Sequence, residues 1–126
     1  FVEALDSTIA NLPGKTLIIS SADLSHVGPA FGDNQALAGE EEPAKAFRQK
    51  VATHDHEMLK LFTEQKIDDL IGSISWQQNP TRWCSIGNMA AAMRLTKPEK
   101  VELLNYAAAM DPNGTTFVST AALAMF

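Results

Sequence analysis

The chain has 126 residues, of which 45% are hydrophobic and 20% charged, an ordinary balance for a globular protein, and we expect a single domain. The formal net charge of −5 argues against a nucleic-acid surface and against docking on an anionic membrane. No apolar run is long enough to span a bilayer, no signal peptide is visible and the lone cysteine excludes an internal disulfide, so the sequence favours a cytoplasmic protein.

The first elements predict an α/β fold. Apolar residues recur at helical spacing over residues 1–12, and Pro13-Gly14 ends this predicted helix. Residues 16–21 contain an unbroken apolar run, Leu17-Ile18-Ile19, which is typical of a strand buried on both faces and therefore of a parallel sheet. A helix, a tight loop and a buried strand in this order are typical of an α/β layer fold. Residues 22–42 are expected to be a long loop.

Three further helices are predicted in the middle of the chain. The first begins at Pro43 and runs to about residue 65, with His54 and Asp55 at the edges of its apolar face and His56 pointing to solvent. That apolar face consists of Ala44, Phe47, Val51, Met58, Leu59 and Phe62. Residues 67–74 form a short second helix that Gly72 is expected to break, and residues 84–95 form a third.

The end of the chain predicts an antiparallel β-hairpin. Residues 101–110 and 116–126 read as its strands, and Asp111-Pro112-Asn113-Gly114 between them is a strong turn sequence. A competing interpretation is that residues 96–99, Thr-Lys-Pro-Glu, form a capping box that begins a helix at residue 97.

Residues 20–28, Ser-Ser-Ala-Asp-Leu-Ser-His-Val-Gly, are the most informative stretch for chemistry. They follow the apolar run, and ligands of open α/β sheets bind beyond the carboxyl ends of the strands. Asp23 and His26 can therefore converge on one pocket, where histidine acts as a general acid or base beside a carboxylate. The alternative is that Asp23 caps a turn and His26 is structural.

Cys84 is the second candidate, because it lies at or near the start of a predicted helix. Helix N-termini favour the thiolate, which is the form that ligates metals, although free cysteines are more often small packed residues. His54 and His56 face apart on a helix and cannot ligate one ion together. Trp76, Trp83 and Phe31 can rim a pocket or pack in the core. A serine nucleophile beside His26 is disfavoured, because no Gly-x-Ser-x-Gly elbow surrounds it.

Three stretches together resemble the Memo-like family, which includes the B protein of the AmmeMemoRadiSam system. They are Ile19-Ser-Ser-Ala-Asp-Leu-Ser-His26-Val-Gly28, Asn79 to Asn88 with its cysteine motif, and the closing strands with Leu103-Leu104-Asn105-Tyr106 and Val118 to Ala122. Asp55 resembles an acidic position on the long helix of the family. Because the chain begins with Phe1, we expect it to be a fragment, and the resemblance implies that it is the C-terminal half of such a protein.

The resemblance implies an α/β core similar to class III extradiol dioxygenases, and a metal pocket. Cys84 is then a metal ligand, joined by two histidines of the N-terminal half, and Asp23 and His26 are catalytic residues lining the same pocket. A thiolate ligand favours iron, copper or zinc and departs from the carboxylate of the dioxygenases. The implied activity is that of a metal-dependent oxidoreductase.

The implied partners follow from what the chain lacks. This chain would not hold the metal alone, so the missing N-terminal half or a second copy in a homodimer is expected to complete the pocket. The alternative is a non-catalytic adaptor module that binds a small molecule or a peptide.

Overall fold

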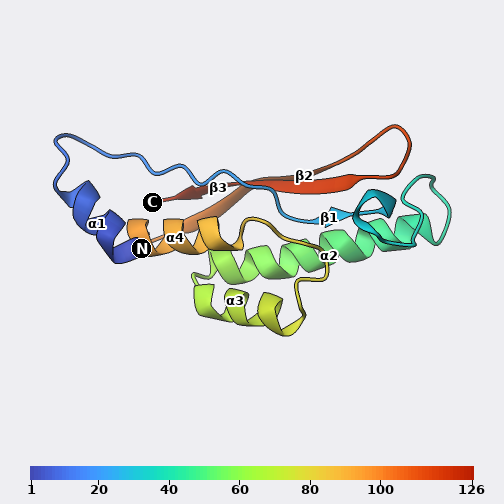
Figure 1. The fold of residues 1–126 in the computed structure, drawn as a ribbon, viewed down its shortest axis with the longest axis horizontal. Coiled ribbons are helices and arrows are strands. Elements are labelled where there is room, and N and C mark those ends of the chain that lie inside the picture. Colours follow the sequence, from blue (N-terminus) through green and yellow to red (C-terminus); the bar gives the residue numbers. More distant parts are fainter.

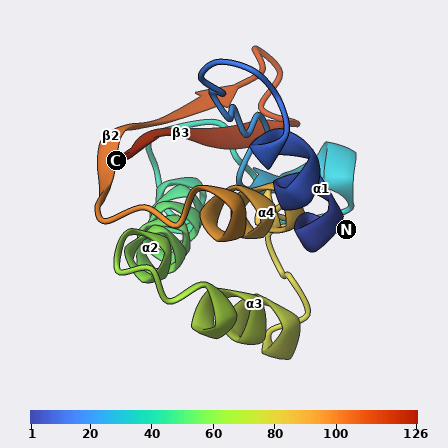
Figure 2. The ribbon, with the colours of Figure 1, turned by 90° about the vertical axis from the view of Figure 1, so that its left-hand side faces the viewer.

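The computed structural model describes all residues, 1–126, and combines helices with a small sheet (Figure 1). In chain order the elements are α1 (Val2–Ala10), β1 (His26–Val27), a 3-10 turn η1 (Pro29–Phe31), α2 (Ala44–Thr63), α3 (Ile67–Trp76), α4 (Ile86–Thr96), β2 (Val101–Met110) and β3 (Phe117–Met125). The sheet forms one layer, α2 and α4 lie beneath it, and α3 lies on the far side of those two helices (Figure 2). None of the helices is both long and apolar enough to span a bilayer.

The sheet has the strand order β1-β3-β2 and is antiparallel throughout. The predicted hairpin is confirmed, with Met110 opposite Phe117 next to the turn. The Asp111 carboxylate closes this turn by accepting backbone N–H groups, that of Thr116 above all, and these hydrogen bonds lower the pKa of Asp111. The competing helix beginning at residue 97 is wrong, because Lys97 ends α4 in a left-handed conformation.

The predicted parallel core strand at residues 16–21 is not present. Those residues form no strand, and Leu17 and Ile19 are 82% and 78% exposed. An apolar run predicts burial only where other strands pair with it on both sides, and in this structure the segment has no paired neighbour. The coarser prediction of a fold that mixes helices and a sheet is confirmed.

The predicted helices are present, with one difference. Gly72 does not break α3, which continues to Trp76. The cost of a glycine inside a helix is at most about 1 kcal/mol. The burial of Leu70 and Ile74 on the inner face of α3 outweighs that cost.

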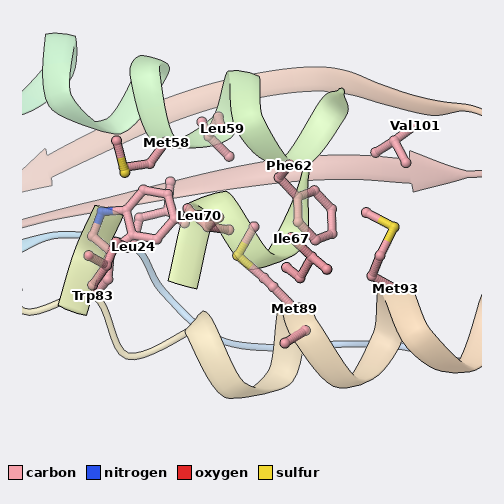
Figure 3. Packing of buried hydrophobic residues seen from close by; sticks show 12 residues of the cluster. Leu24, Met58, Leu59, Phe62, Ile67, Leu70, Trp83, Met89, Met93 and Val101 are labelled. Atoms are coloured by element: carbon pink, nitrogen blue, oxygen red, sulfur yellow. The ribbon is translucent and has the colours of Figure 1, made fainter. Parts of the chain in front are cut away.

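The core lies between the sheet layer and the helices. Its larger cluster joins α2, α3 and α4 to the start of β2, as Figure 3 shows for Phe62, Met89, Met93 and Val101. A smaller cluster of Val27, Leu37, Val51 and Phe117 packs the other end of α2 against β1 and β3. The two clusters fix the segment that carries Asp23 and His26 against α2.

Gly28 is required by the backbone at the end of β1. Its φ of +121° lies in a region that side chains rarely adopt, and an added Cβ would lie 2.5 Å from the Thr115 carbonyl oxygen. We therefore expect Gly28→Ala to lower the free energy of unfolding by about 2–4 kcal/mol in urea denaturation. Gly72→Ala is the matched control, since nothing lies within 4 Å of the new Cβ. It should raise stability by about 0.5–1 kcal/mol, and equal losses in both variants would contradict the argument.

Candidate functional site

The backbone of residues 24–27 is held between β3 and the loop that precedes α4. Leu24 N–H donates to the Ser119 carbonyl (2.8 Å), and Ser119 N–H donates back to the Ser25 carbonyl (3.0 Å). On the other side, His26 N–H donates to the Thr81 carbonyl (2.7 Å). This double anchoring fixes the direction of the Asp23 and His26 side chains.

Asp23 and His26 form the pair that the sequence predicts. His26 Nε2 lies 3.7 Å from Asp23 Oδ2, with Asp23 half-exposed and His26 mostly buried. His26 Nδ1 faces two carbonyl oxygens, those of Leu24 (3.1 Å) and Arg82 (3.2 Å). Because carbonyl oxygens only accept hydrogen bonds, Nδ1 carries a proton, and in the neutral ring Nε2 is left with a free lone pair beside the carboxylate. Nε2 can therefore accept a proton or ligate a metal.

Arg82 and Asp33 surround His26 and were not singled out in the sequence. The Arg82 guanidinium donates to both carboxylate oxygens of Asp33 (2.9 and 3.1 Å) and to the His26 carbonyl oxygen (3.1 Å). Asp33 also accepts the Gly28 N–H (2.8 Å). Hydrogen bonding from Arg82 holds the pKa of Asp33 below its usual value, and the same contact raises the pKa of Arg82. This ion pair fixes the loop after β1 over His26, whose ring also meets Phe31 edge-on.

Cys84 joins the same site from the other side. Its thiol is exposed and its Sγ donates to the Asp23 carbonyl oxygen at 3.3 Å, although the two residues are 61 positions apart. Cys84 precedes α4, which begins at Ile86. The fold thus places the Cys84 thiol against the backbone of Asp23, whose carboxylate lies beside His26.

Asp55 lies directly behind this site and is fully buried. Its Oδ1 accepts hydrogen bonds from Ser25 Oγ (2.5 Å) and Trp83 Nε1 (2.7 Å). Its Oδ2 accepts from Tyr106 OH (2.7 Å) and Ser119 Oγ (2.5 Å). Burial first, and then the bond to Asp55, raises the pKa of Tyr106 well above its usual range. The sequence signals for this network were the place of Asp55 at the edge of the apolar face of α2 and its resemblance to an acidic position of the family.

The remaining candidates lie apart from the pair or are inaccessible. Ser25 is fully buried and bonded to Asp55, which disfavours it as a nucleophile. His54 contacts the edge of Trp83, while His56 is exposed on α2, as predicted. Trp83 is buried, which confirms core packing, the alternative left open for it, whereas Trp76 is exposed at the end of α3 and does not line the hollow described below. No group of three or more His, Cys, Asp or Glu side chains is arranged to hold a metal ion.

An apolar hollow of about 660 Å³ adjoins the site. It lies between residues 16–22, α4 and β3, and Ala22, Leu24 and Ser85 line it next to Asp23 and Cys84. Neither Asp23, His26 nor Cys84 lines the hollow itself. It therefore offers apolar surface beside the polar groups and no acid or base of its own.

The comparisons with known proteins agree with the resemblance in the sequence. The family model described as Memo-like protein matches residues 1–126, which is the whole chain. A search of the curated proteins and a search of the solved structures each found no match. The motif around Asp23 and His26, the cysteine motif and the closing hairpin thus occur in one chain that the family model covers from end to end. The chain belongs to the Memo-like protein family.

Proposed function

We propose that this chain supplies the acid–base side of a metal-dependent redox or oxygenase-type centre in an extradiol-dioxygenase-like protein. The observation that carries the proposal is the Asp23–His26 pair together with the contact of the Cys84 thiol with the Asp23 backbone, which joins two segments far apart in the sequence. His26 is the general acid or base, Asp23 is its charge partner, and Cys84 is a metal ligand.

The role of His26 follows from its two ring nitrogens. Nδ1 is occupied by carbonyl oxygens, so a substrate proton can be taken up only at Nε2. Once Nε2 is protonated, the Asp23 carboxylate at 3.7 Å stabilises the imidazolium. The carbonyl contacts hold the ring in place while the proton moves, so no reorientation is required.

The residues of this chain do not fit a complete metal site. A catalytic metal is usually held by at least three protein ligands, and no such group is present here. Cys84 contributes one soft ligand, which favours iron, copper or zinc. We propose that the other ligands come from a further part of the protein or from a second copy. A bound metal would supply Lewis-acid or redox chemistry.

A second candidate function is ligand binding without chemistry. The apolar hollow beside Asp23 and Cys84 favours it, because binding sites combine apolar walls with a few polar groups. The two functions differ in their dependence on Cys84, which lies outside the lining of the hollow.

Cobalt titration tests the metal-ligand role. Added imidazole should supply the missing nitrogen ligands, so that cobalt binding to the protein with imidazole gives a thiolate-to-cobalt charge-transfer absorption. Cys84→Ala should abolish the absorption and weaken cobalt binding by at least about tenfold, because it removes the soft ligand. His56→Ala, on the exposed face of α2, is the control and should change neither. Equal cobalt affinity in wild type and Cys84→Ala would refute the metal-ligand role and favour ligand binding.

A further inference from the structure

Asp55 connects the two segments that carry the site. Of its four hydrogen-bond donors, Ser25 directly precedes His26 and Trp83 directly precedes Cys84. We infer that Asp55 is a positioning residue, whose buried carboxylate fixes the His26 segment and the Cys84 segment relative to each other. The inference rests on the proposed function, since it assigns Asp55 to that site.

The two carboxylate oxygens of Asp55 accept hydrogen bonds from different parts of the fold, which supports this role. Oδ2 accepts only from the sheet, from Tyr106 on β2 and Ser119 on β3. Oδ1 accepts only from the two site segments, and Trp83 Nε1 also reaches Ser25 Oγ at 3.1 Å. The sheet therefore holds the carboxylate through one oxygen, and the carboxylate holds the site through the other.

The core alone gives no reason for a carboxylate at this position. A buried carboxylate loses its hydration, and apolar residues of similar volume often pack as well or better. Four donors match the acceptor capacity of the two oxygens, so each donor has one defined position. Ser119 extends the arrangement, because its Oγ also accepts the Ser25 N–H at 3.0 Å. The network thus specifies geometry at the base of the site.

Three single substitutions separate positioning from stability. Ser25→Ala removes the Oδ1 contact to the His26 segment, and Trp83→Phe keeps a ring in the core while it removes the Oδ1 contact to the Cys84 segment. Tyr106→Phe is the matched control, because it removes a hydrogen bond to the same carboxylate on the sheet side. Ser25→Ala and Trp83→Phe each remove a buried hydrogen bond to Asp55, and Tyr106→Phe removes a part-buried one. Trp83→Phe also removes the donor to Ser25 Oγ, and losses of stability of similar size are expected in all three variants.

Two signals report the site without a metal or substrate. Nitrogen NMR shifts of His26 give its tautomer ratio, and the alkylation rate by iodoacetamide reports Cys84, the only cysteine of the chain. Ser25→Ala should change the His26 tautomer ratio, and Trp83→Phe the Cys84 alkylation rate, each by about fivefold, which corresponds to one buried hydrogen bond. Tyr106→Phe should change both signals by clearly less, because Ser119 still donates to Oδ2 and both Oδ1 contacts to the site segments remain.

The outcomes separate this inference from the metal proposal. If all three variants lose stability and neither signal moves in Ser25→Ala or Trp83→Phe, Asp55 is a core residue only and the inference fails. The inference also fails if Tyr106→Phe moves both signals as much as the other two variants. Should either Ser25→Ala or Trp83→Phe not fold, the other still decides the result. The His26 tautomer ratio and the Cys84 alkylation rate are measured without a metal and do not depend on the cobalt titration. Failure of the metal-ligand proposal can therefore be distinguished from failure of the Asp55 inference.

Discussion

Replacing Trp83 by alanine should lower the free energy of unfolding by about 3–5 kcal/mol, the loss expected for a buried tryptophan. The side chain is 3% exposed and lies beside Leu24 and Met58 in the larger core cluster (Figure 3). Its Nε1–H donates to Asp55 at 2.7 Å, so the substitution also leaves the buried carboxylate with one donor fewer. Urea unfolding followed by far-UV circular dichroism measures the change without relying on tryptophan fluorescence.

The chain contains its own control for this substitution. Trp76 is the other tryptophan, at the end of α3, and it is 88% exposed. Trp76→Ala should change the free energy of unfolding by no more than about 0.5 kcal/mol. Similar losses in the two variants would show that burial in this core is not what stabilises Trp83.

The features predicted from the sequence are those with local causes. The hairpin was predictable because Asp111-Pro112-Asn113-Gly114 carries its own turn chemistry. The helix over Ala44–Thr63 was predictable because its apolar face repeats at helical spacing. Asp23 and His26 were found because they share one short motif, and Cys84 because it lies near the start of a predicted helix, within the cysteine motif.

The parallel strand could not be judged from the sequence, because its cause is not local. Leu17-Ile18-Ile19 has the composition of a central strand, but composition does not reveal whether another strand pairs beside it. In this structure none does, and Leu17 and Ile19 are exposed. Gly72 is the opposite case. Glycine does disfavour a helix locally, as predicted, but the packing of α3 outweighs this preference and the helix continues to Trp76.

The polar networks around the site could not be predicted from the sequence either, because their contacts are also not local. Arg82 pairs with Asp33 across 49 residues, and Asp55 takes its Ser119 contact across 64. No periodicity or spacing links such residues, because each is brought to the site by a different element of the fold. Asp55 alone gave a hint, as a charged residue at the edge of an apolar helix face.

Asp33→Asn should make the protein less stable at neutral pH, by about 1–2 kcal/mol. This figure is at the lower end for a bidentate ion pair, because the Arg82 side chain is 38% exposed and water screens the attraction. The substitution keeps the size of the side chain and removes its charge. Urea unfolding of both proteins at a series of pH values measures the difference in the free energy of unfolding.

The pH dependence has a definite sign. Arg82 holds the pKa of Asp33 in the folded protein below the ordinary value of 3.8. The contribution of the ion pair is therefore fully present above that value and is lost as the pH falls through the lower pKa of the folded state. The stability difference between wild type and Asp33→Asn should shrink in the same acidic window. Glu57→Gln removes an exposed charge of the same sign from α2 and should cost no more than about 0.5 kcal/mol at neutral pH.

Asp33→Asn should also change the tautomer ratio of His26, so the ion pair that stabilises the fold also affects the site. Without the carboxylate, the Arg82 guanidinium loses its bidentate partner, while its backbone carbonyl still faces His26 Nδ1 at 3.2 Å. A loosened Arg82 weakens one of the two carbonyl contacts that hold the proton on Nδ1, so the Nε2-protonated tautomer of His26 should become more populated. If the tautomer ratio stays unchanged while stability falls, the Leu24 carbonyl alone fixes the ring, and the Asp33–Arg82 pair only fastens the loop.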